Sequence, residues 1–405
     1  MAQGCLQSPA PSIDALRDMC SNHSSGTTVT RVADGRPDWI VDGGLLRHSQ
    51  TNYFSIGLYA GDQGEPLLLM EQTETALVML LVAEVDGRDA VLLSLRTEPG
   101  LIGLTNLTAT IQSTPSNYLR KHGGRGTPFI EIAGDPDAHG TVLHDGEQYD
   151  WGEYYHGKTK RFLVVRLDVP VDAPAGFRWV PMDTARALLL EDNLVTNDLR
   201  VLLTLVEARS SGEANGPHAV KTTGRGPRLR SIGFEPGVVD SRGISVSFFS
   251  TQTETREVRR WVQPLLVPIN PISIRLPFVR TSAGTRFAVE RRSQPGLLGH
   301  ELWFPADVRD SRTGRDARIV RTVRTSAEGG RFWKQAIEIS LVELAAEVEA
   351  EVDSAAPAEN LPRVEARASW MSDDELSSLV AQPLQTSLEL RMAWSLVHAA
   401  SLHHA

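Results

Sequence analysis

Apolar residues are grouped along this chain in short continuous runs, the pattern of buried β-strands. The clearest runs cover 76–85 and 90–95, and the Asp86-Gly87 pair between them is typical of a hairpin turn. A further run over 161–169 predicts another strand. Because polar residues rarely interrupt these runs, we expect both faces of their sheet to be covered.

Helical patterns come mainly after the strands. Leu199, Leu202, Leu203 and Val206 share one helical face, as expected of a helix packed on a sheet. We predict four helices: over 13–19 after Ser12, from the cap Asp183 to Leu190, over 198–208 after the cap Asn197, and after the capping box of Ser372 and Glu375. Each half of the chain thus runs from a sheet to closing helices, an α+β organisation.

The chain also presents the same motifs twice. The run 95–103, with Glu98-Pro-Gly at its centre, is matched by 290–299, with Gln294-Pro-Gly. Trp179, Asp183 and Arg200 recur, all at one common offset, as Trp370, Asp374 and Arg391. A repeat this long indicates a duplicated domain, because solenoid repeats are only about 20 to 50 residues long.

The repeat divides the chain into four parts. We predict an N-terminal arm over 1–25, a first module over 26–208, a linker over 209–231 and a second module over 232–405. The linker assignment rests on a stretch rich in Gly, Ser and Pro. If the modules are equivalent, Arg200 and Arg391 should lie at equivalent helix positions.

Composition excludes several classes of protein. The 405 residues are 41% hydrophobic and 22% charged, as in ordinary globular proteins, and a formal charge of −9 argues against a general nucleic-acid binder. The longest apolar stretch is too short to span a membrane, and the N-terminus lacks signal-peptide features. With two cysteines, a cytoplasmic location is expected. Neither zinc-ligand spacing nor a dinucleotide-binding glycine motif occurs, so we expect no metal and no cofactor.

The first module carries about 26 extra residues in its middle. They fall around 108–126, where hydrogen-bonding side chains, cations and an aromatic ring are concentrated between glycines. Arg and Lys can bind phosphate oxygens, and Tyr can stack on a base or sugar. The segment is therefore either a ligand-binding loop or a solvated surface loop.

Several motifs resemble one known family, the NDP-hexose 2,3-dehydratases of deoxysugar biosynthesis. The similar stretches run from about residue 38 to the C-terminus: Arg96-Thr-Glu-Pro-Gly100, Thr110-Ile-Gln-Ser-Thr-Pro-Ser-Asn-Tyr118, 192–200, Trp261-Val-Gln-Pro-Leu265 and Ser326-Ala-Glu-Gly-Gly-Arg-Phe332. The resemblance implies two tandem Nudix-hydrolase-like modules, each a mixed β-sheet with flanking helices, and a homodimer. The metal-binding box of a true Nudix hydrolase is missing.

The resemblance also implies the reaction. A dTDP-linked 4-keto-6-deoxyhexose would lose its C3 proton and C2 hydroxyl, and the 3,4-diketo-2,6-dideoxy product would pass to a 3-ketoreductase as a transient partner. We expect the active site in the first module, with Glu98, Tyr118 or His122 as acid and base. The expected substrate-binding residues are Arg96, Gln112, Ser113, Thr114, Asn117, Arg120, Lys121, Arg125, Tyr154, Glu328 and Arg331, with Arg120, Lys121 or Arg125 on the diphosphate.

Two segments depart from the family pattern. Residues 149–162 differ in the first module, and Glu301-Leu-Trp-Phe-Pro305 differs in the second, whose pocket we expect to be reduced or empty. An alternative function therefore stays open. The chain could be a diverged relative that binds a ligand without sugar dehydration, or one that acts on a different carbonyl substrate.

Overall fold

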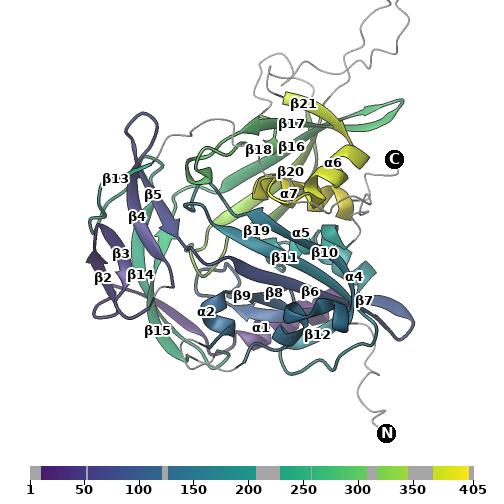
Figure 1. Ribbon diagram of the computed structural model, residues 1–405, viewed down its shortest axis with the longest axis horizontal. Coiled ribbons are helices and arrows are strands. Elements are labelled where there is room, and N and C mark those ends of the chain that lie inside the picture. The colour runs from purple at the N-terminus through teal and green to yellow at the C-terminus, as the bar shows by residue number, and fades with distance from the viewer. Residues whose placement is uncertain are drawn as a thin grey trace, which may run out of the picture.

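The described part of the chain forms a mixed α+β structure with four β-sheets (Figure 1). The computed structural model describes residues 11–51, 53–120, 126–206, 229–256, 258–307, 317–344 and 368–400. Most of the predicted linker, 209–228, lies outside these residues. None of the helices within the described ranges is long and apolar enough to cross a membrane.

The first main sheet has seven strands, in the order β10-β11-β6-β7-β12, with β8 on β7 and β9 on β6. Only β6 and β11 pair in parallel. The predicted hairpin is confirmed as β6 and β7, and the predicted strand over 161–169 as β11. The bounds are β6 (Ala76–Val85), β7 (Arg88–Thr97), β8 (Thr105–Thr108), β9 (Ile111–Ser113), β10 (Gly140–Tyr149), β11 (Thr159–Leu167) and β12 (Phe177–Pro181).

Strand β6 is buried on both faces, as its unbroken apolar sequence predicts. Val78, Leu80 and Val82 belong to the main hydrophobic core. Met79 and Leu81, on the opposite face, pack in a second cluster. Since successive side chains point to opposite faces, both sides of this sheet must be covered.

The second main sheet repeats the pairing scheme of the first. Its order is β18-β17-β16-β20-β19, with β21 also on β17, and only β16 and β20 are parallel. Counterparts of β6, β7, β10 and β11 are thus β16, β17, β19 and β20. The bounds are β16 (Ile272–Thr281), β17 (Gly284–Arg292), β18 (Leu302–Pro305), β19 (Arg318–Ser326), β20 (Ala336–Glu343) and β21 (Ala368–Ser372).

The two smaller sheets combine strands from both halves of the chain. One has the order β1-β14-β15; the other is β13-β4-β3-β2, with β5 on β4. Their strands are β1 (Thr28–Val32), β2 (Trp39–Asp42), β3 (Leu45–His48), β4 (Ser55–Ala60), β5 (Pro66–Glu71), β13 (Arg230–Ser231), β14 (Ser245–Gln252) and β15 (Arg260–Val267). The predicted domain boundaries therefore separate strands that share a sheet.

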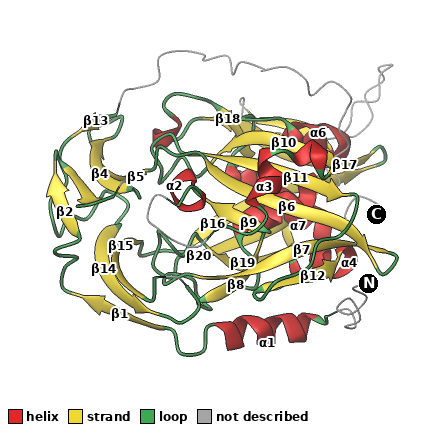
Figure 2. Ribbon diagram, turned by 60° about the horizontal axis from the view of Figure 1, so that its bottom comes forward, coloured by secondary structure: helices red, strands yellow, loops and turns green. Residues whose placement is uncertain are grey.

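The helices pack against the main sheets, with α5 beside α7 between them and α1 along β7 and β8 (Figures 1 and 2). The predicted Ser12 cap and the capping box of Ser372 and Glu375 are confirmed. The helices are α1 (Ile13–His23), α2 (Pro115–Tyr118), α3 (Ile130–Gly134), α4 (Met182–Leu188), α5 (Asn197–Leu205), α6 (Asp373–Ala381) and α7 (Leu388–Ala399), with the 3₁₀ turns η1 (Pro136–Ala138) and η2 (Pro295–Leu297).

Two predicted helix caps are wrong. The cap of α5 is Thr196, whose hydroxyl accepts from the Leu199 amide. Asn197 instead donates its side-chain amide to the Ser326 carbonyl at 3.1 Å, a contact with the other half. Asp183 lies inside the first turn of α4, where it accepts from the Thr184 amide at 2.6 Å.

The two halves meet through a reciprocal pair of glycine contacts. The Gly100 amide donates to the Gly329 carbonyl at 2.8 Å, and the Gly296 amide donates to the Gly152 carbonyl at 2.7 Å. Each half thus offers a Pro-Gly loop to the other and receives one on a glycine-containing turn. These hydrogen bonds define corresponding positions in the two halves.

Close packing at both contacts requires glycine. A Cβ on Gly100 would lie 1.7 Å from the Phe332 carbonyl oxygen, and a Cβ on Gly296 would lie 1.7 Å from the Tyr155 carbonyl oxygen. Real atoms cannot approach so closely. Both contacts therefore require glycine, and the backbones of the two halves approach each other equally closely at each of them.

Arg200 and Arg391 also match, because each lies four residues after the cap of its helix, α5 or α7. Their amides donate to the cap carbonyls of Thr196 and Ser387. Both side chains are fully buried. Their positions agree with the equivalence expected from the common sequence offset.

Candidate functional site

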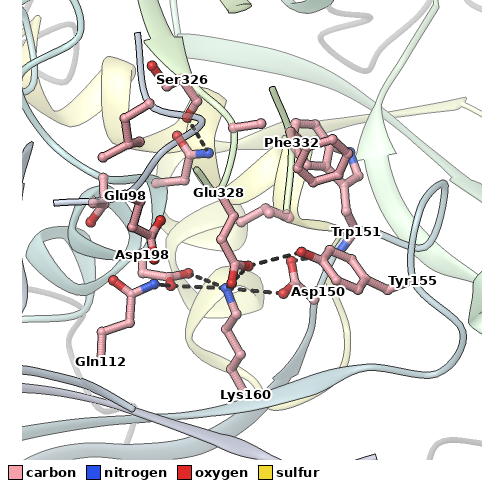
Figure 3. A pocket seen from close by; sticks show the side chains of 15 residues that line it. Glu98, Gln112, Asp150, Trp151, Tyr155, Lys160, Asp198, Ser326, Glu328 and Phe332 are labelled. Carbon is pink, nitrogen blue, oxygen red and sulfur yellow. Dashed lines mark hydrogen bonds and ion pairs between the residues drawn. The ribbon is translucent and has the colours of Figure 1, made fainter. Parts of the chain in front are cut away.

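A polar cavity lies where the two main sheets meet (Figure 3). The first half contributes strand, loop and helix residues, and the second half contributes the turn 326–332 and Leu388, at the start of α7. The polar side chains on its wall are Glu98, Gln112, Asp150, Tyr155, Lys160, Thr196, Asn197, Asp198, Ser326 and Glu328, and apolar walls come from Leu101, Trp151, Ala327, Phe332 and Leu388.

Lys160, near the start of β11, is at the centre of the charged groups. Its ammonium lies 2.9 Å from both carboxylate oxygens of Asp198 and 3.1 Å from Asp150 Oδ2. Glu328, from the second half, approaches the same ammonium at 3.7 Å. Figure 3 shows these carboxylates converging on the Lys160 nitrogen.

A second lysine, Lys158, binds two of the same carboxylates. Its ammonium lies 2.8 Å from Asp150 Oδ2 and 3.0 Å from Glu328 Oε2. It also sits 3.9 Å above the ring of Tyr155, whose hydroxyl donates to Glu328 at 3.0 Å. Lys158 lies just before β11 and Lys160 is the second residue of that strand, and both ammonium groups reach Asp150 and Glu328.

Mutual pairing keeps most of these groups charged despite their burial. Burial alone would lower the pKa of Lys160, but Asp150, Asp198 and Glu328 raise it above its ordinary value. Burial likewise opposes ionisation of Glu328, yet Lys158, Lys160 and Arg331 hold its pKa well below the usual range. The site therefore holds fixed charges with little water around them, where electrostatic effects are strong.

Two groups have pKa values shifted upwards. Burial raises the pKa of Asp198, and Lys160 only partly offsets the effect. Burial and the charges of Glu328 and Asp150 raise the pKa of Tyr155 well above 10. Asp198 is accordingly a stronger base than an exposed aspartate, and Tyr155 remains a proton donor at neutral pH.

Glu98 and Gln112 complete the wall of the cavity. Gln112, on β9, donates to Asp198 Oδ2 at 2.5 Å and accepts from the Thr108 hydroxyl at 2.7 Å. Glu98 accepts from Arg96 Nε at 2.7 Å and from the Gly330 amide at 2.9 Å. A carboxylate of the first half thus fixes the turn that carries Glu328.

Some sequence-predicted site residues come together here. Glu98, Gln112 and Glu328 line the cavity, and Arg96 contacts Glu98 and the Gln112 carbonyl. Tyr154 and Arg331 lie beside it: the Tyr154 ring packs on Phe332 at 5.1 Å between ring centroids, and Arg331 donates to Gln72.

Other predicted residues do not reach the cavity wall. Tyr118 packs against the second hydrophobic cluster, and Asn117 and Arg120 are exposed. Ser113 ends β9 and Thr114 directly precedes α2, and neither lines the cavity. His122, Lys121 and Arg125 lie outside the described residues. The functional roles assigned to all of these residues stay predictions.

Sequence reasoning missed Asp150, Tyr155, Lys158, Lys160 and Asp198 as site residues. Four of them belong to the segment 149–162, which drew notice as a departure from the family pattern. Two lysines entering an apolar strand were the available signal, because charged side chains are rarely buried unless paired.

The corresponding place in the second half is built differently. Gln294 stands at the position of Glu98, Glu389 at that of Asp198, and Ile337 at that of Lys160. There Gln294 donates to Glu389 at 2.7 Å. Next to it lies a small apolar cluster of Leu297, Leu302 and Phe304, packed against Tyr149.

No group of three or more His, Cys, Asp or Glu side chains is arranged to hold a metal ion within the described ranges.

Comparisons with known proteins agree on one family. Residues 14–206 match the family described as NDP-hexose 2,3-dehydratase. A dTDP-4-dehydro-6-deoxy-alpha-D-glucopyranose 2,3-dehydratase of Streptomyces violaceoruber is 28% identical over 350 residues, 73% of this chain and 79% of that protein. A protein of the same name from Saccharopolyspora spinosa is 32% identical over 149 residues, 37% of this chain and 30% of that protein.

Among solved structures, an ADP compounds hydrolase covers 44% of this chain and 89% of its own, at 15% identity and a TM-score of 0.24. That score is too low to support an argument about the fold.

Proposed function

We propose that this chain, whose residues 14–206 match the NDP-hexose 2,3-dehydratase family, is a hydro-lyase that removes water across C2 and C3 of a nucleotide-diphospho-4-keto-6-deoxyhexose. The similar proteins are named for dTDP-4-dehydro-6-deoxyglucose, which makes this sugar nucleotide the first substrate to test. The product would be a 3,4-diketo-2,6-dideoxy sugar.

The reaction requires three functions from the protein. The C4 carbonyl acidifies the C3 proton, which a base removes to leave an enolate. Electrons of the enolate then expel the C2 hydroxyl, which takes up a proton and leaves as water. The resulting enol then tautomerises: C2 gains a proton, the C3 hydroxyl loses one, and the 3,4-diketone forms. The protein must therefore supply a base near C3, a positive charge or donor near the C4 oxygen, and an acid near the C2 oxygen.

The observation that carries the proposal is the buried ammonium of Lys160 among three carboxylates. Since its pKa is raised, the group stays protonated and presents a fixed positive charge in the cavity. A fixed charge facing a developing enolate oxygen needs no reorganisation during the reaction. We assign Lys160 the role of stabilising that oxygen.

The base and acid are assigned from the remaining groups. Asp198 combines a raised pKa with a place on the cavity wall, which suits a base for the C3 proton. Tyr155 keeps its proton and has the carboxylate of Glu328 behind it, which suits a donor to the leaving hydroxyl. Glu98 lines the same cavity and is the second candidate base.

The wider organisation belongs to the same proposal. Two tandem Nudix-like modules, over 26–208 and 232–405, are supported by the shared strand order and the reciprocal glycine contacts. The homodimer, the cytoplasmic location and the downstream 3-ketoreductase rest on the family resemblance and on composition.

The decisive experiment separates proton removal from elimination. The purified protein is given dTDP-4-keto-6-deoxyglucose in D₂O, and deuterium at C3 is followed by NMR; with a 3-ketoreductase present, net turnover is followed as well. Asp198→Asn should abolish exchange and turnover together. Tyr155→Phe should keep exchange and lower turnover about 10²- to 10⁴-fold.

Tyr118→Phe is the matched control for Tyr155→Phe, because it removes the same hydroxyl from the tyrosine that the sequence suggested as acid or base. If Tyr118→Phe stops turnover and Tyr155→Phe does not, the donor assignment moves to the residue first suggested by the sequence. The proposed function itself fails if the wild-type protein neither consumes this sugar nucleotide nor gives binding heat with millimolar dTDP or UDP.

A further inference from the structure

A buried arginine of the second half binds the end of strand β10 in the first half. Arg391, on α7, donates from Nη2 to the Tyr149 carbonyl at 2.5 Å. Its Nη1 donates to Gln148 Oε1 at 3.4 Å and also to the Thr386 carbonyl. Only 1% of Arg391 is exposed. This guanidinium therefore ties the C-terminal helix to a strand of the other half.

The strand end that Arg391 holds leads directly into the site. Asp150 follows Tyr149, and its Oδ2 lies 2.8 Å from the Lys158 ammonium and 3.1 Å from that of Lys160. Its amide donates to the Lys158 carbonyl at 2.9 Å. In the peptide group between Tyr149 and Asp150, the carbonyl thus accepts from Arg391 and the amide donates to the Lys158 carbonyl.

Two further hydrogen bonds join the same segments. The Gln148 side chain donates to the Gln382 carbonyl at 3.0 Å, and the Leu384 amide donates to the Glu147 carbonyl at 3.0 Å. The loop between α6 and α7 is therefore hydrogen-bonded to the end of β10. Arg391 is the charged donor in this contact between the halves, and charged donors form stronger hydrogen bonds than neutral ones.

Arg200 is a natural comparison, because it occupies the corresponding position on α5. Its guanidinium is equally buried but bonds within its own half, to the Leu189 carbonyl at 2.7 Å and the Glu191 carbonyl at 3.4 Å. Neither arginine forms an ion pair with a carboxylate in the described part of the chain. The two differ in what their donors hold, so one serves as a control for the other.

We infer that Arg391 is a positioning residue of the site: by holding the Tyr149 carbonyl it keeps Asp150 against Lys158 and Lys160. The consequence for turnover rests on the proposed function; the consequence for Asp150 does not. A misplacement of about 1 Å in a reactive site can lower the rate about 10²-fold, so a contact outside the cavity can matter for the reaction.

The direct test follows Asp150 itself and needs no turnover. Protein labelled with ¹³C in the aspartate carboxyl groups is titrated, and the Asp150 signal is identified by its loss in Asp150→Asn. Arg391→Lys retains a positive charge on α7 but loses the two-armed reach to Tyr149. Burial raises the pKa of Asp150, but Lys158 and Lys160 more than offset this and hold it below its ordinary value, so a displaced Asp150 should titrate at a higher pH.

Arg200→Lys is the matched control. It makes the same chemical change at an equally buried site, and it should leave the Asp150 titration unchanged. Equal shifts in both variants, or no shift in folded Arg391→Lys, would overturn the inference. If Arg391→Lys does not fold, Gln148→Met decides. It removes the side-chain links to Gln382 and Arg391 and should raise the Asp150 pKa less, and an unchanged pKa contradicts the inference.

Turnover adds a second readout. With dTDP-4-keto-6-deoxyglucose, Arg391→Lys should lower kcat at least tenfold and leave KM within about twofold, while Arg200→Lys leaves both near wild type. A change in KM alone would contradict a positioning role. If wild-type protein shows no turnover, the proposed function is at fault, and the titration still decides the role of Arg391.

Discussion

Two corresponding regions lie where the halves of the chain meet, and we call them the first place and the second place. Their backbone contacts correspond, but their side chains differ in charge. In the first, Glu98, Asp198 and Lys160 surround a cavity that Glu328 closes from the other half. In the second, Gln294, Glu389 and Ile337 occupy the matching positions, and Trp151 stands where Glu328 would be. Lysine and two carboxylates are replaced there by neutral side chains.

The second place lacks the lysine together with most of the carboxylates that pair with it in the first. A buried ammonium is tolerated only with carboxylates beside it, and a carboxylate left without its partner is strongly destabilising. In the second place only Glu389 keeps its charge type, and it is bound by the Gln294 amide. We therefore interpret the first place as selected for chemistry and the second as kept for packing.

The largest expected effect comes from giving the first place the apolar character of the second. Lys160→Met removes one ammonium and leaves three carboxylates with Lys158 alone. We expect unfolding free energy to fall by about 3–5 kcal/mol and turnover by at least about 10²- to 10³-fold. Urea unfolding and the coupled turnover assay measure the two effects. Ile337→Met, the matched change in the second half, should cost less than about 1.5 kcal/mol and leave turnover intact. Equal effects would break the comparison.

The second prediction tests what the places share. Gly100→Ala and Gly296→Ala should each lower the free energy of unfolding by about 1–3 kcal/mol or more, because either Cβ would collide with a carbonyl oxygen of the other half. Thermal unfolding measures the loss. Gly134→Ala, at the end of α3 with nothing near its Cβ, should be neutral or stabilise by up to about 1 kcal/mol. A stable Gly100→Ala protein would show that the contact is not needed.

A third pair of variants exchanges one residue between the places. Glu98→Gln removes the charge facing Arg96 and should lower turnover about tenfold with little change in substrate affinity, the equivalent of about 1.4 kcal/mol in the barrier. Gln294→Glu puts a second carboxylate beside Glu389 and should destabilise the fold by about 1–2 kcal/mol without affecting turnover. Steady-state kinetics and urea unfolding separate these outcomes. Loss of turnover in Gln294→Glu would mean that the second place also participates.

The smallest expected effect is in the acid stability. The pKa of Glu328 is lowered on folding, so its contribution is full above about pH 4.5 and is lost as the pH falls through the lower, folded value. Asp198, with a raised pKa, acts in the opposite sense and reduces the net effect. Between pH 7 and pH 3, wild type should therefore lose more unfolding free energy than Glu328→Gln, as urea unfolding at the two pH values would measure. A Glu328→Gln protein with the same pH dependence as wild type would contradict the comparison.

Local chemistry made much of the fold predictable. The turn residues Asp86 and Gly87 fix the hairpin of β6 and β7, and the side chains of Ser372 and Glu375 fix the start of α6, all through contacts between near neighbours. Asn197 shows where this reasoning fails. Its amide is used by Ser326, more than a hundred residues away, so the neighbouring Thr196 caps the helix.

The site was predictable only in part for the same reason. Glu98, Gln112 and Glu328 stand in recognisable motifs and do line the cavity. A lysine entering an apolar strand was a signal for Lys160, but the strand pattern could not identify its partners, because Asp150, Asp198 and Glu328 come from three separate parts of the chain. A buried cation is intelligible only when its partners are known.

The shared construction of the site also bears on synthesis by the ribosome. Glu328 and the turn that receives Gly100 are made 130 residues after Asp198. At about 5–20 residues per second, the first half waits roughly 7–26 s for them. During that time Glu328 is missing as a partner of Lys160 and as the acceptor for the Tyr155 hydroxyl. The Gly329 carbonyl, which accepts from the Gly100 amide, is missing as well. The site is complete only once translation has also passed Leu388, which lines the cavity, and Arg391, which binds the strand end before Asp150.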